Sequence, residues 1–199
     1  RFKDEIVPVT ITTRKGETVV EDDEYIRHGV EYDSLAKLRP AFEKDGTVTA
    51  GNASGINDGA AAVVLATAEA AEKAGLTPKF RVLGYAHAGV RPEVMGIGPV
   101  PAVQNLFAKT GLCADDFDVI ESNEAFASQA LAVSQELGFD GARVNPNGGA
   151  IALGHPVGAT GAILTVKAMY ELERTGKKRA LITMCIGGGQ GIALAIERI

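Results

Sequence analysis

The chain has 199 residues, of which 46% are hydrophobic, and a formal net charge of -5. This composition supports a folded core and excludes global disorder. Lys and Arg are scattered through an acidic chain, so we expect no nucleic-acid partner. Gly, Pro or a charged residue interrupts every apolar run before the roughly 18 to 20 residues of a membrane span are reached, so we expect a soluble protein that does not bind membranes.

Cysteine usage and the start of the chain give further expectations. Cys113 and Cys185 lie in dissimilar surroundings and no secretory signal is in view, so we expect reduced thiols and a cytoplasmic location. The start at Arg1, without Met or a targeting segment, favours a piece of a longer functional unit. The acidic run 21–24 lacks the spacing and loop glycine of a calcium motif, so we expect no metal site.

The first third of the chain has weak periodicity until residue 55. Alternating apolar residues at 6–12 and 18–20, with a turn between them, predict a β-hairpin. One or two helical turns are expected at 34–38, before Pro40. From residue 56 the sequence pattern changes and becomes more apolar. The apolar run 60–67 predicts a strand covered on both faces, followed by a helix at 68–74.

The remaining chain has the alternating rhythm of an α/β fold. We expect strands at 81–88, 117–121, 180–185 and 192–196. We expect helices at 100–109, from about 126 to 137, and at 162–172. Phe126, Ala130, Val133 and Leu137 recur at helical spacing and should face the core. The last two strands, joined by a glycine-rich turn, predict a buried hairpin.

A glycine-rich stretch from Asn145 to Leu164 holds a single histidine, His155, whose freedom is limited by the following Pro156. The stretch fits neither a P-loop, because no Lys and Ser or Thr follow its last glycine, nor a dinucleotide fingerprint, because no acidic residue follows at a strand end. From this histidine alone, a structural imidazole and a catalytic one both remain open.

Two other polar groups stand at comparable junctions. Asn123 lies between a predicted strand and a helix, where Asn is often only a helix cap. Cys185 ends an apolar strand before three glycines whose N–H groups could form an anion-stabilising nest, a setting that can also lower the pKa of a thiol. Polar groups at the carboxyl ends of strands suit a ligand crevice, so Asn123, His155 and Cys185 predict one active site. Cys113 and His87 have no comparable neighbouring groups in the sequence, so we expect both to be structural. We expect His28 to be exposed.

Three motifs in this order and spacing resemble the C-terminal signatures of thiolases. They are N-E-A-F-A from Asn123, N-P-N-G-G-A-I-A-L-G-H-P-V-G-A-T-G over 145–161, and C-I-G-G-G-Q-G over 185–191. The earlier segments T-V-T-A-G-N-A-S-G-I-N-D-G-A-A-A over 47–62 and V-M-G-I-G-P-V-P-A over 94–102 look most like the acetyl-CoA acetyltransferases of this family. The resemblance covers essentially the whole chain.

The resemblance implies an α/β fold in layers. Thiolases are longer, with two similar β-α-β-α-β-α-β-β halves and a loop domain inserted in the first. Residues 1–55 would be the tail of the loop domain, 56–78 the last strand and helix of the N-terminal half, and 79–199 the C-terminal half. The segment with the family's nucleophilic cysteine is absent, so we expect it on a partner, the N-terminal half. Complete subunits would form a homo-oligomer, a tetramer by resemblance.

The chemistry implied is reversible condensation of two acetyl-CoA to acetoacetyl-CoA and free CoA, with CoA thioesters as substrates and no cofactor. By resemblance, His155 accepts the proton of the nucleophile. Cys185 is the acid/base that removes the α-proton of the second acetyl-CoA. His155 and a water held by Asn123 would form one oxyanion hole, and the N–H of Gly187 half of the other.

The resemblance also implies binding residues. Those for coenzyme A are Arg27 and Ser34 towards the nucleotide, and Phe42, Ala50 and Ser54 along the pantetheine. Those lining the acyl pocket are Met95 and Phe126, which favour a short acyl chain.

Two other interpretations stay open. One is a degradative 3-ketoacyl-CoA thiolase that accepts longer chains. The other is a non-catalytic CoA-binding or lipid-carrier relative, which predicts loss of the catalytic group, whereas Asn123, His155 and Cys185 are all present.

Overall fold

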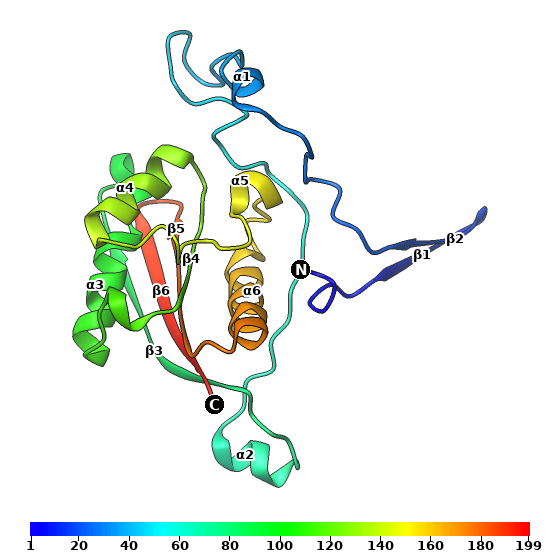
Figure 1. Ribbon diagram of the computed structural model, residues 1–199, viewed down its shortest axis with the longest axis vertical. Helices are drawn as coiled ribbons and strands as arrows, with labels where there is room; N and C mark the ends of the chain where they lie inside the picture. The colour runs from blue at the N-terminus through cyan, green and yellow to red at the C-terminus, as the bar shows by residue number, and fades with distance from the viewer.

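The computed structural model describes residues 1–199 and contains one four-stranded sheet with helices on both faces (Figure 1). The strands are β3 (Phe80–Gly89), β4 (Val119–Ser122), β5 (Arg179–Ile186) and β6 (Gln190–Arg198), in the spatial order β3-β6-β5-β4. The helix α3 (Pro99–Thr110) packs on β3 and β6, and α6 (Thr160–Thr175) packs on β4 and β5. The predicted α/β layering of this region is confirmed.

The sheet is mixed, and its last strands form the predicted hairpin. β6 runs antiparallel to both β3 and β5, while β4 runs parallel to β5. The outer edge of β4 is covered by a loop, since Ile120 N donates to Arg143 O at 2.9 Å and Asn145 N donates to Ile120 O at 2.8 Å. The chain that enters the glycine-rich stretch is therefore fixed to the edge of the sheet.

Side chains alternate between two apolar cores, one on each face of the sheet. Beneath α3, Leu106 packs with Ile120 and Leu181, and all three are almost fully buried. Beneath α6, Leu172 and Val119 belong to the second core. Coverage of both faces explains why these strands read as nearly continuous apolar runs.

Helix ends follow the predicted signals. Two prolines occupy the first turn of α3, where the ring is tolerated. Gly111, Gly138 and Gly176 end α3, α4 (Ala127–Leu137) and α6 with φ values of 73°, 64° and 70°, a left-handed conformation that favours glycine. The core-facing stripe of α4 is confirmed in outline: Val133 is fully buried, and the other three residues of the stripe are half-buried.

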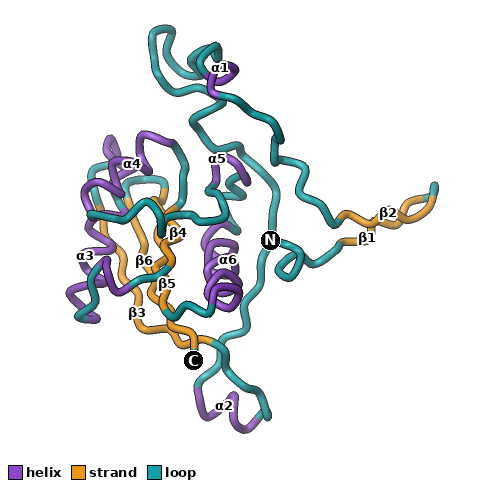
Figure 2. The backbone as a smooth tube through the Cα atoms, in the orientation of Figure 1, coloured by secondary structure: helices purple, strands orange, loops and turns teal.

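The first part of the chain extends away from the sheet (Figure 2). β1 (Val9–Thr13) and β2 (Gly16–Val20) form the predicted antiparallel hairpin. α1 (Tyr32–Leu35) is a single helical turn that begins two residues before the expected 34–38 and ends at Leu35. α2 (Ala68–Lys73) begins where predicted, with the Thr67 hydroxyl accepting from Ala70 N. These elements are confirmed.

The predicted strand at 60–67 is wrong for this chain. The segment is extended but irregular, and Val64 and Leu65 are 90% and 78% exposed. Apolar composition favours a buried strand, but a strand also needs a neighbour to complete its hydrogen-bond ladder, and no other strand of the chain runs beside this segment. Its apolar side chains therefore stay uncovered.

Three short helices were not predicted. They are the 3₁₀ helices Pro92–Ile97 and Ala114–Asp116 and the helix α5 (Ala150–Leu153). Each is about one or two turns long, too short to establish a helical period in the sequence. Both the first and the third lie close to the predicted site.

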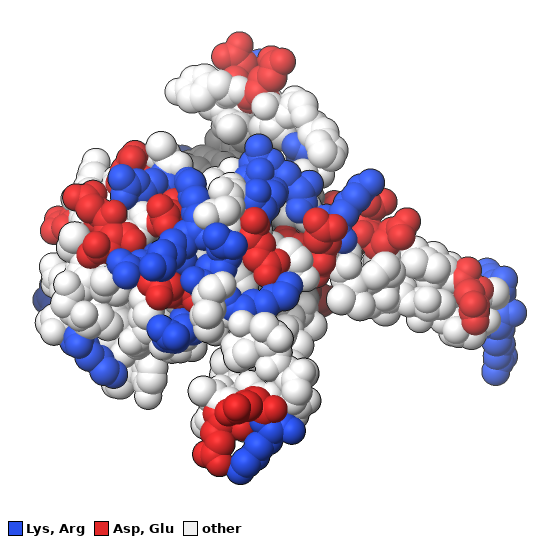
Figure 3. Space-filling view, turned by 60° about the horizontal axis from the view of Figure 1, so that its bottom comes forward, with Lys and Arg blue, Asp and Glu red and all other residues white.

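Charge is mixed on the surface. On the face shown in Figure 3, Lys and Arg side chains are interspersed with Asp and Glu. No helix combines the length and the hydropathy needed to cross a bilayer. His28 is exposed, as expected, and Cys113 is an exposed free thiol at the start of a 3₁₀ helix.

Candidate active site

The end of β4 brings Asn123 against His155. Asn123 follows β4 directly, and its backbone N–H donates to Thr183 O of β5 at 3.0 Å. The side chain is 1% exposed, and its Nδ2 lies 3.3 Å from Nε2 of His155. Cys185 lies just beyond Thr183 on β5 and is also buried. All three predicted groups therefore lie at the same end of the sheet.

Hydrogen bonds assign the tautomer of His155. Nδ1 of the ring lies 2.6 Å from the Thr160 hydroxyl, which donates its only hydrogen to Pro156 O at 2.9 Å. The Thr160 oxygen can then only accept, so we assign the ring proton to Nδ1 and the lone pair to Nε2. Burial lowers the pKa of His155 below its ordinary value of 6.5, so the imidazole is neutral at pH 7 with Nε2 as a base.

A distant segment holds the backbone of His155. The N–H of His155 donates to Asn57 Oδ1 at 3.1 Å and to Gly55 O at 3.3 Å. Gly154, with φ of 92°, lies so close to Asn57 that an added Cβ would come within 2.6 Å of Oδ1. No local sequence signal indicated this contact, because Asn57 and His155 lie far apart along the chain.

The turn after Cys185 is glycine-rich for two reasons. Gly188 and Gly189 have φ values of 87° and 95°. A Cβ on Gly187 would meet no heavy atom within 4 Å, so the space beside its backbone is open to a ligand. The expectation that this setting lowers the pKa of Cys185 is wrong: burial disfavours the thiolate and raises the pKa above the ordinary 9.0.

The predicted acyl-pocket residues lie on neighbouring elements. Met95 is half-buried on the 3₁₀ helix Pro92–Ile97, which packs against α4, and Phe126 immediately precedes α4. Gly98, at the end of that 3₁₀ helix, approaches the backbone of Gly191 so closely that neither residue could carry a side chain. This contact fixes the Met95 helix to the hairpin that contains Cys185.

The predicted coenzyme A residues are only partly brought to the site. Ser54 is close, since its N–H and hydroxyl both donate to Ala125 O, at 3.0 and 3.1 Å. The Phe42 ring is 74% exposed and lies edge-on to Phe126, with ring centroids 6.3 Å apart. Ala50 is exposed nearby along the same segment. Arg27 and Ser34 are exposed further along it, and the Ser34 hydroxyl donates to Glu31 O at 2.6 Å.

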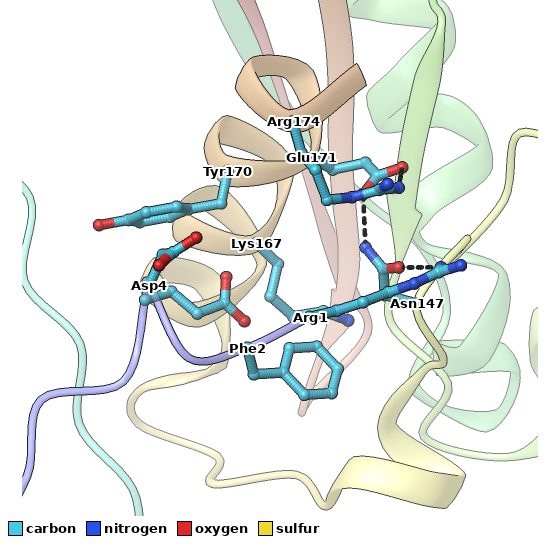
Figure 4. A pocket seen from close by; sticks show the side chains of 9 residues that line it. Arg1, Phe2, Asp4, Asn147, Lys167, Tyr170, Glu171 and Arg174 are labelled. Carbon is cyan, nitrogen blue, oxygen red and sulfur yellow. Dashed lines mark hydrogen bonds and ion pairs between the residues drawn. The ribbon is translucent and has the colours of Figure 1, made fainter.

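Charged side chains hold the glycine-rich stretch 145–164 through contacts to Gly148 and Asn147. Lys167 Nζ donates to Gly148 O at 2.7 Å and pairs with Glu121 Oε2 at 3.2 Å, and both side chains are buried. Burial raises the pKa of Glu121 to about 7 although Lys167 opposes the shift. Asn147 donates to Glu171 and accepts from Arg1 (Figure 4). No motif in the sequence indicated this network.

Two family models match almost the entire chain. Residues 76–198 match the thiolase C-terminal domain, and residues 1–69 match the thiolase N-terminal domain. The chain belongs to the thiolase family. The resemblance seen in the sequence motifs is thereby confirmed.

Curated thiolases of several names match the whole chain. It is 60% identical to the β-ketoadipyl-CoA thiolase of Pseudomonas putida, 58% identical to a β-ketothiolase of Cupriavidus necator, and 55% identical to the acetyl-CoA acetyltransferase of Paracoccus denitrificans. The first two alignments span 50% of the relative and the third spans 51%. The chain therefore spans about half the length of the curated relatives it matches.

Solved structures of thiolases share the fold. The acetyl-CoA acetyltransferase of Bacillus anthracis superposes with a TM-score of 0.96 at 49% identity, over all of this chain and 50% of that one. Human mitochondrial 3-ketoacyl-CoA thiolase in complex with CoA superposes with a TM-score of 0.86 at 44% identity, over 96% of this chain and 48% of that one. The predicted thiolase fold is confirmed.

Thr160 gives the first test of the site. We expect Thr160→Val to release the ring proton of His155 from Nδ1, because valine offers no oxygen to accept it. In ¹⁵N spectra at pH 7, the unaltered protein should show one tautomer, with Nδ1 protonated, and the variant a mixture. The ring should titrate below pH 6.5 in the unaltered protein, because burial disfavours the imidazolium.

The matched control for Thr160→Val is Thr160→Ser, which keeps the hydroxyl and should keep the single tautomer. A protein with Nε2 protonated at pH 7, or a valine variant with an unchanged spectrum, would contradict the assignment.

Proposed function

We propose that the chain is the C-terminal part of an acetyl-CoA C-acetyltransferase that condenses two acetyl-CoA to acetoacetyl-CoA and CoA, reversibly. The N-terminal half of the subunit supplies the nucleophilic cysteine. The observation that carries the proposal is the basic Nε2 of His155, held 3.3 Å from the Asn123 amide at the sheet end where Cys185 lies. Membership of the thiolase family gives this geometry its chemical context.

In the first step, acetyl transfers from CoA to the nucleophilic cysteine. His155 Nε2 takes the proton of that thiol, the thiolate attacks the thioester carbonyl, and the CoA sulfur leaves with the proton of the Cys185 thiol. Cys185 is then a thiolate, and His155 is an imidazolium. Only a neutral imidazole can take this proton, and the lowered pKa of His155 keeps the ring neutral at pH 7. Once protonated at Nε2, His155 becomes a hydrogen-bond donor and can stabilise an oxyanion together with a water on Asn123.

In the second step, Cys185 removes the α-proton of the second acetyl-CoA. The Cys185 thiolate takes this proton, the enolate attacks the acetyl thioester of the nucleophile, and a carbon–carbon bond forms. The nucleophilic cysteine leaves with the proton that His155 held. Burial raises the pKa of Cys185, which makes its thiolate a stronger base for this weakly acidic proton. In the cleavage direction the same thiol returns the proton. The N–H of Gly187, beside open space, is one donor to the acyl oxygen.

Five residues along 27–54, all exposed except the half-buried Ser54, are proposed to bind coenzyme A. Arg27 supplies the positive charge for the nucleotide end, and Ser34 lies further along the same segment. Phe42, Ala50 and Ser54 follow the pantetheine towards the site. The exposed ring of Phe42 against Phe126 supports this path, because an apolar surface near the acyl pocket suits the pantetheine chain.

The N-terminal half is the proposed partner that completes the site. Residues 1–55 belong to its loop domain, 56–78 are its last strand and helix, and 79–199 form the C-terminal half. The uncovered apolar segment 60–67 supports this division, because a strand of the other half would complete its ladder and bury it. Complete subunits are proposed to form a homo-oligomer, a tetramer by family resemblance.

A specific observation also favours a second candidate, a degradative thiolase. The identity to the β-ketoadipyl-CoA thiolase of Pseudomonas putida, 60%, exceeds the 55% to the acetyl-CoA acetyltransferase of Paracoccus denitrificans. A β-ketoadipyl chain is longer and ends in a carboxylate. The residues proposed to line the acyl pocket, Met95 and Phe126, are apolar, and they favour the short, uncharged acetoacetyl group.

The substrate is tested on the complete subunit by comparing thiolysis of acetoacetyl-CoA, 3-oxoadipyl-CoA and a long-chain 3-oxoacyl-CoA. We expect kcat/KM to be about tenfold or more higher for acetoacetyl-CoA, since a short apolar pocket rejects extra length and an unpaired carboxylate. A higher kcat/KM for 3-oxoadipyl-CoA would establish the second candidate instead.

The role of Cys185 is tested by Cys185→Ser in the complete subunit. We expect condensation to fall by about 1,000-fold, because a serine hydroxyl is a far weaker base–acid couple for this proton transfer. Incorporation of acetyl from acetyl-CoA into the nucleophile should fall far less, since His155 forms the attacking thiolate and the CoA thiolate is a good leaving group. The matched control is Cys113→Ser at an exposed thiol, which should change neither step. Equal loss of both steps in Cys185→Ser would refute the acid/base role.

A further inference from the structure

We propose that Glu124 is a positioning residue that sets the place of His155 relative to Asn123. The proposal rests on the proposed function only in assigning the proton transfer to His155. Glu124 follows Asn123 in the sequence, and the mechanism above gives it no role. Its contacts place it between the strand end that carries Asn123 and the loop that carries His155.

Both oxygens of Glu124 accept hydrogen bonds from that loop. Oε1 accepts from Asn145 Nδ2 at 3.3 Å, and Oε2 accepts from Ile151 N at 3.2 Å. Ile151 lies in the first turn of α5, which ends at Leu153 and leads through Gly154 into His155. Glu124 therefore fixes the short helix immediately before the histidine.

The loop backbone lies directly against the carboxylate. A Cβ at Gly149 would overlap the Glu124 carboxyl group, so a side chain at this position would displace the carboxylate. Gly149 is the N-cap residue immediately before α5. The glycine here thus allows the Glu124 carboxylate to lie directly against the loop.

Asn145 ties the start of the same loop to the strand end. It is the one residue other than glycine with a positive φ, 45°, a conformation that needs support from its surroundings. Its Oδ1 accepts from Ser122 N at 2.9 Å, and its Nδ2 donates to Ser122 O at 2.8 Å as well as to Glu124. The strained residue is stabilised by the residues on either side of Asn123.

These contacts join the two halves of the catalytic pair. Asn123 places one partner of the 3.3 Å contact directly, and Glu124 places the other through α5. Because both oxygens of Glu124 are occupied by loop donors, the carboxylate acts through His155 and not on the substrate.

The test is made in the complete subunit with Glu124→Ala and Glu124→Gln, and with Glu136→Ala at an exposed position of α4 as the matched control. We expect Glu124→Ala to lower kcat by about 100-fold with little change in KM, since a shift of about 1 Å in a catalytic group has this effect. Glu124→Gln keeps one acceptor oxygen and should recover part of the loss. Glu136→Ala should leave kcat unchanged. Rates are expressed per folded molecule, with folding measured by circular dichroism.

A second measurement separates positioning from stability and from the proposed function. The ¹⁵N titration of His155 is expected to show a single tautomer in the unaltered protein and an altered pKa or a mixed tautomer in Glu124→Gln. A lower melting temperature with kcat per folded molecule and the His155 titration both unchanged would overturn the proposal. Absence of acetyl transfer in the unaltered subunit would refute the proposed function instead, and the titration would then decide the role of Glu124.

Discussion

The contact between Asn123 Nδ2 and His155 Nε2, 3.3 Å apart, is the constraint on which the site depends. Asn123 follows the end of β4, whereas His155 lies in a later loop. Between them the chain forms α4 and then runs along the outer edge of β4 before it reaches the site. Nearly every unusual feature of that loop serves this closure. The left-handed Asn145, the side-chain-free Gly149 and Gly154, and the buried Lys167 that donates to Gly148 O all allow or secure the close return of the backbone.

The same closure determines the chemical state of the groups. Thr160 directs the ring proton of His155 to Nδ1, and burial keeps the ring neutral. Cys185, in contrast, gains a raised pKa from burial at the strand end. A neutral imidazole and a protonated thiol can exchange protons with separate partners at pH 7, which suits a reaction that needs two proton transfers. These two protonation states result from burial at the end of the sheet, and no single sequence motif indicates them.

The sequence allowed most of the sheet, the long helices and the grouping of Asn123, His155 and Cys185 to be predicted, because periodicity, glycine caps and motif spacing are local signals. Features that depend on distant partners could not be predicted. The segment 60–67 has the composition of a buried strand but no neighbour in this chain. The contact of Asn57 with His155 and the Glu121–Lys167 pair link residues far apart in sequence. The raised pKa of Cys185 results from burial, which the glycine-rich sequence around this residue does not indicate.

The central claim is that this chain supplies the proton-transfer groups while the acetylated cysteine lies outside it. Mass-spectrometric peptide mapping of the complete subunit after brief exposure to acetyl-CoA and acid quenching tests this claim most directly. We expect one acetyl group on a cysteine of the N-terminal half, with Cys113 and Cys185 unmodified. Acetyl found on Cys185 would contradict the account, because it would make this residue the nucleophile and leave the proposed base without a role.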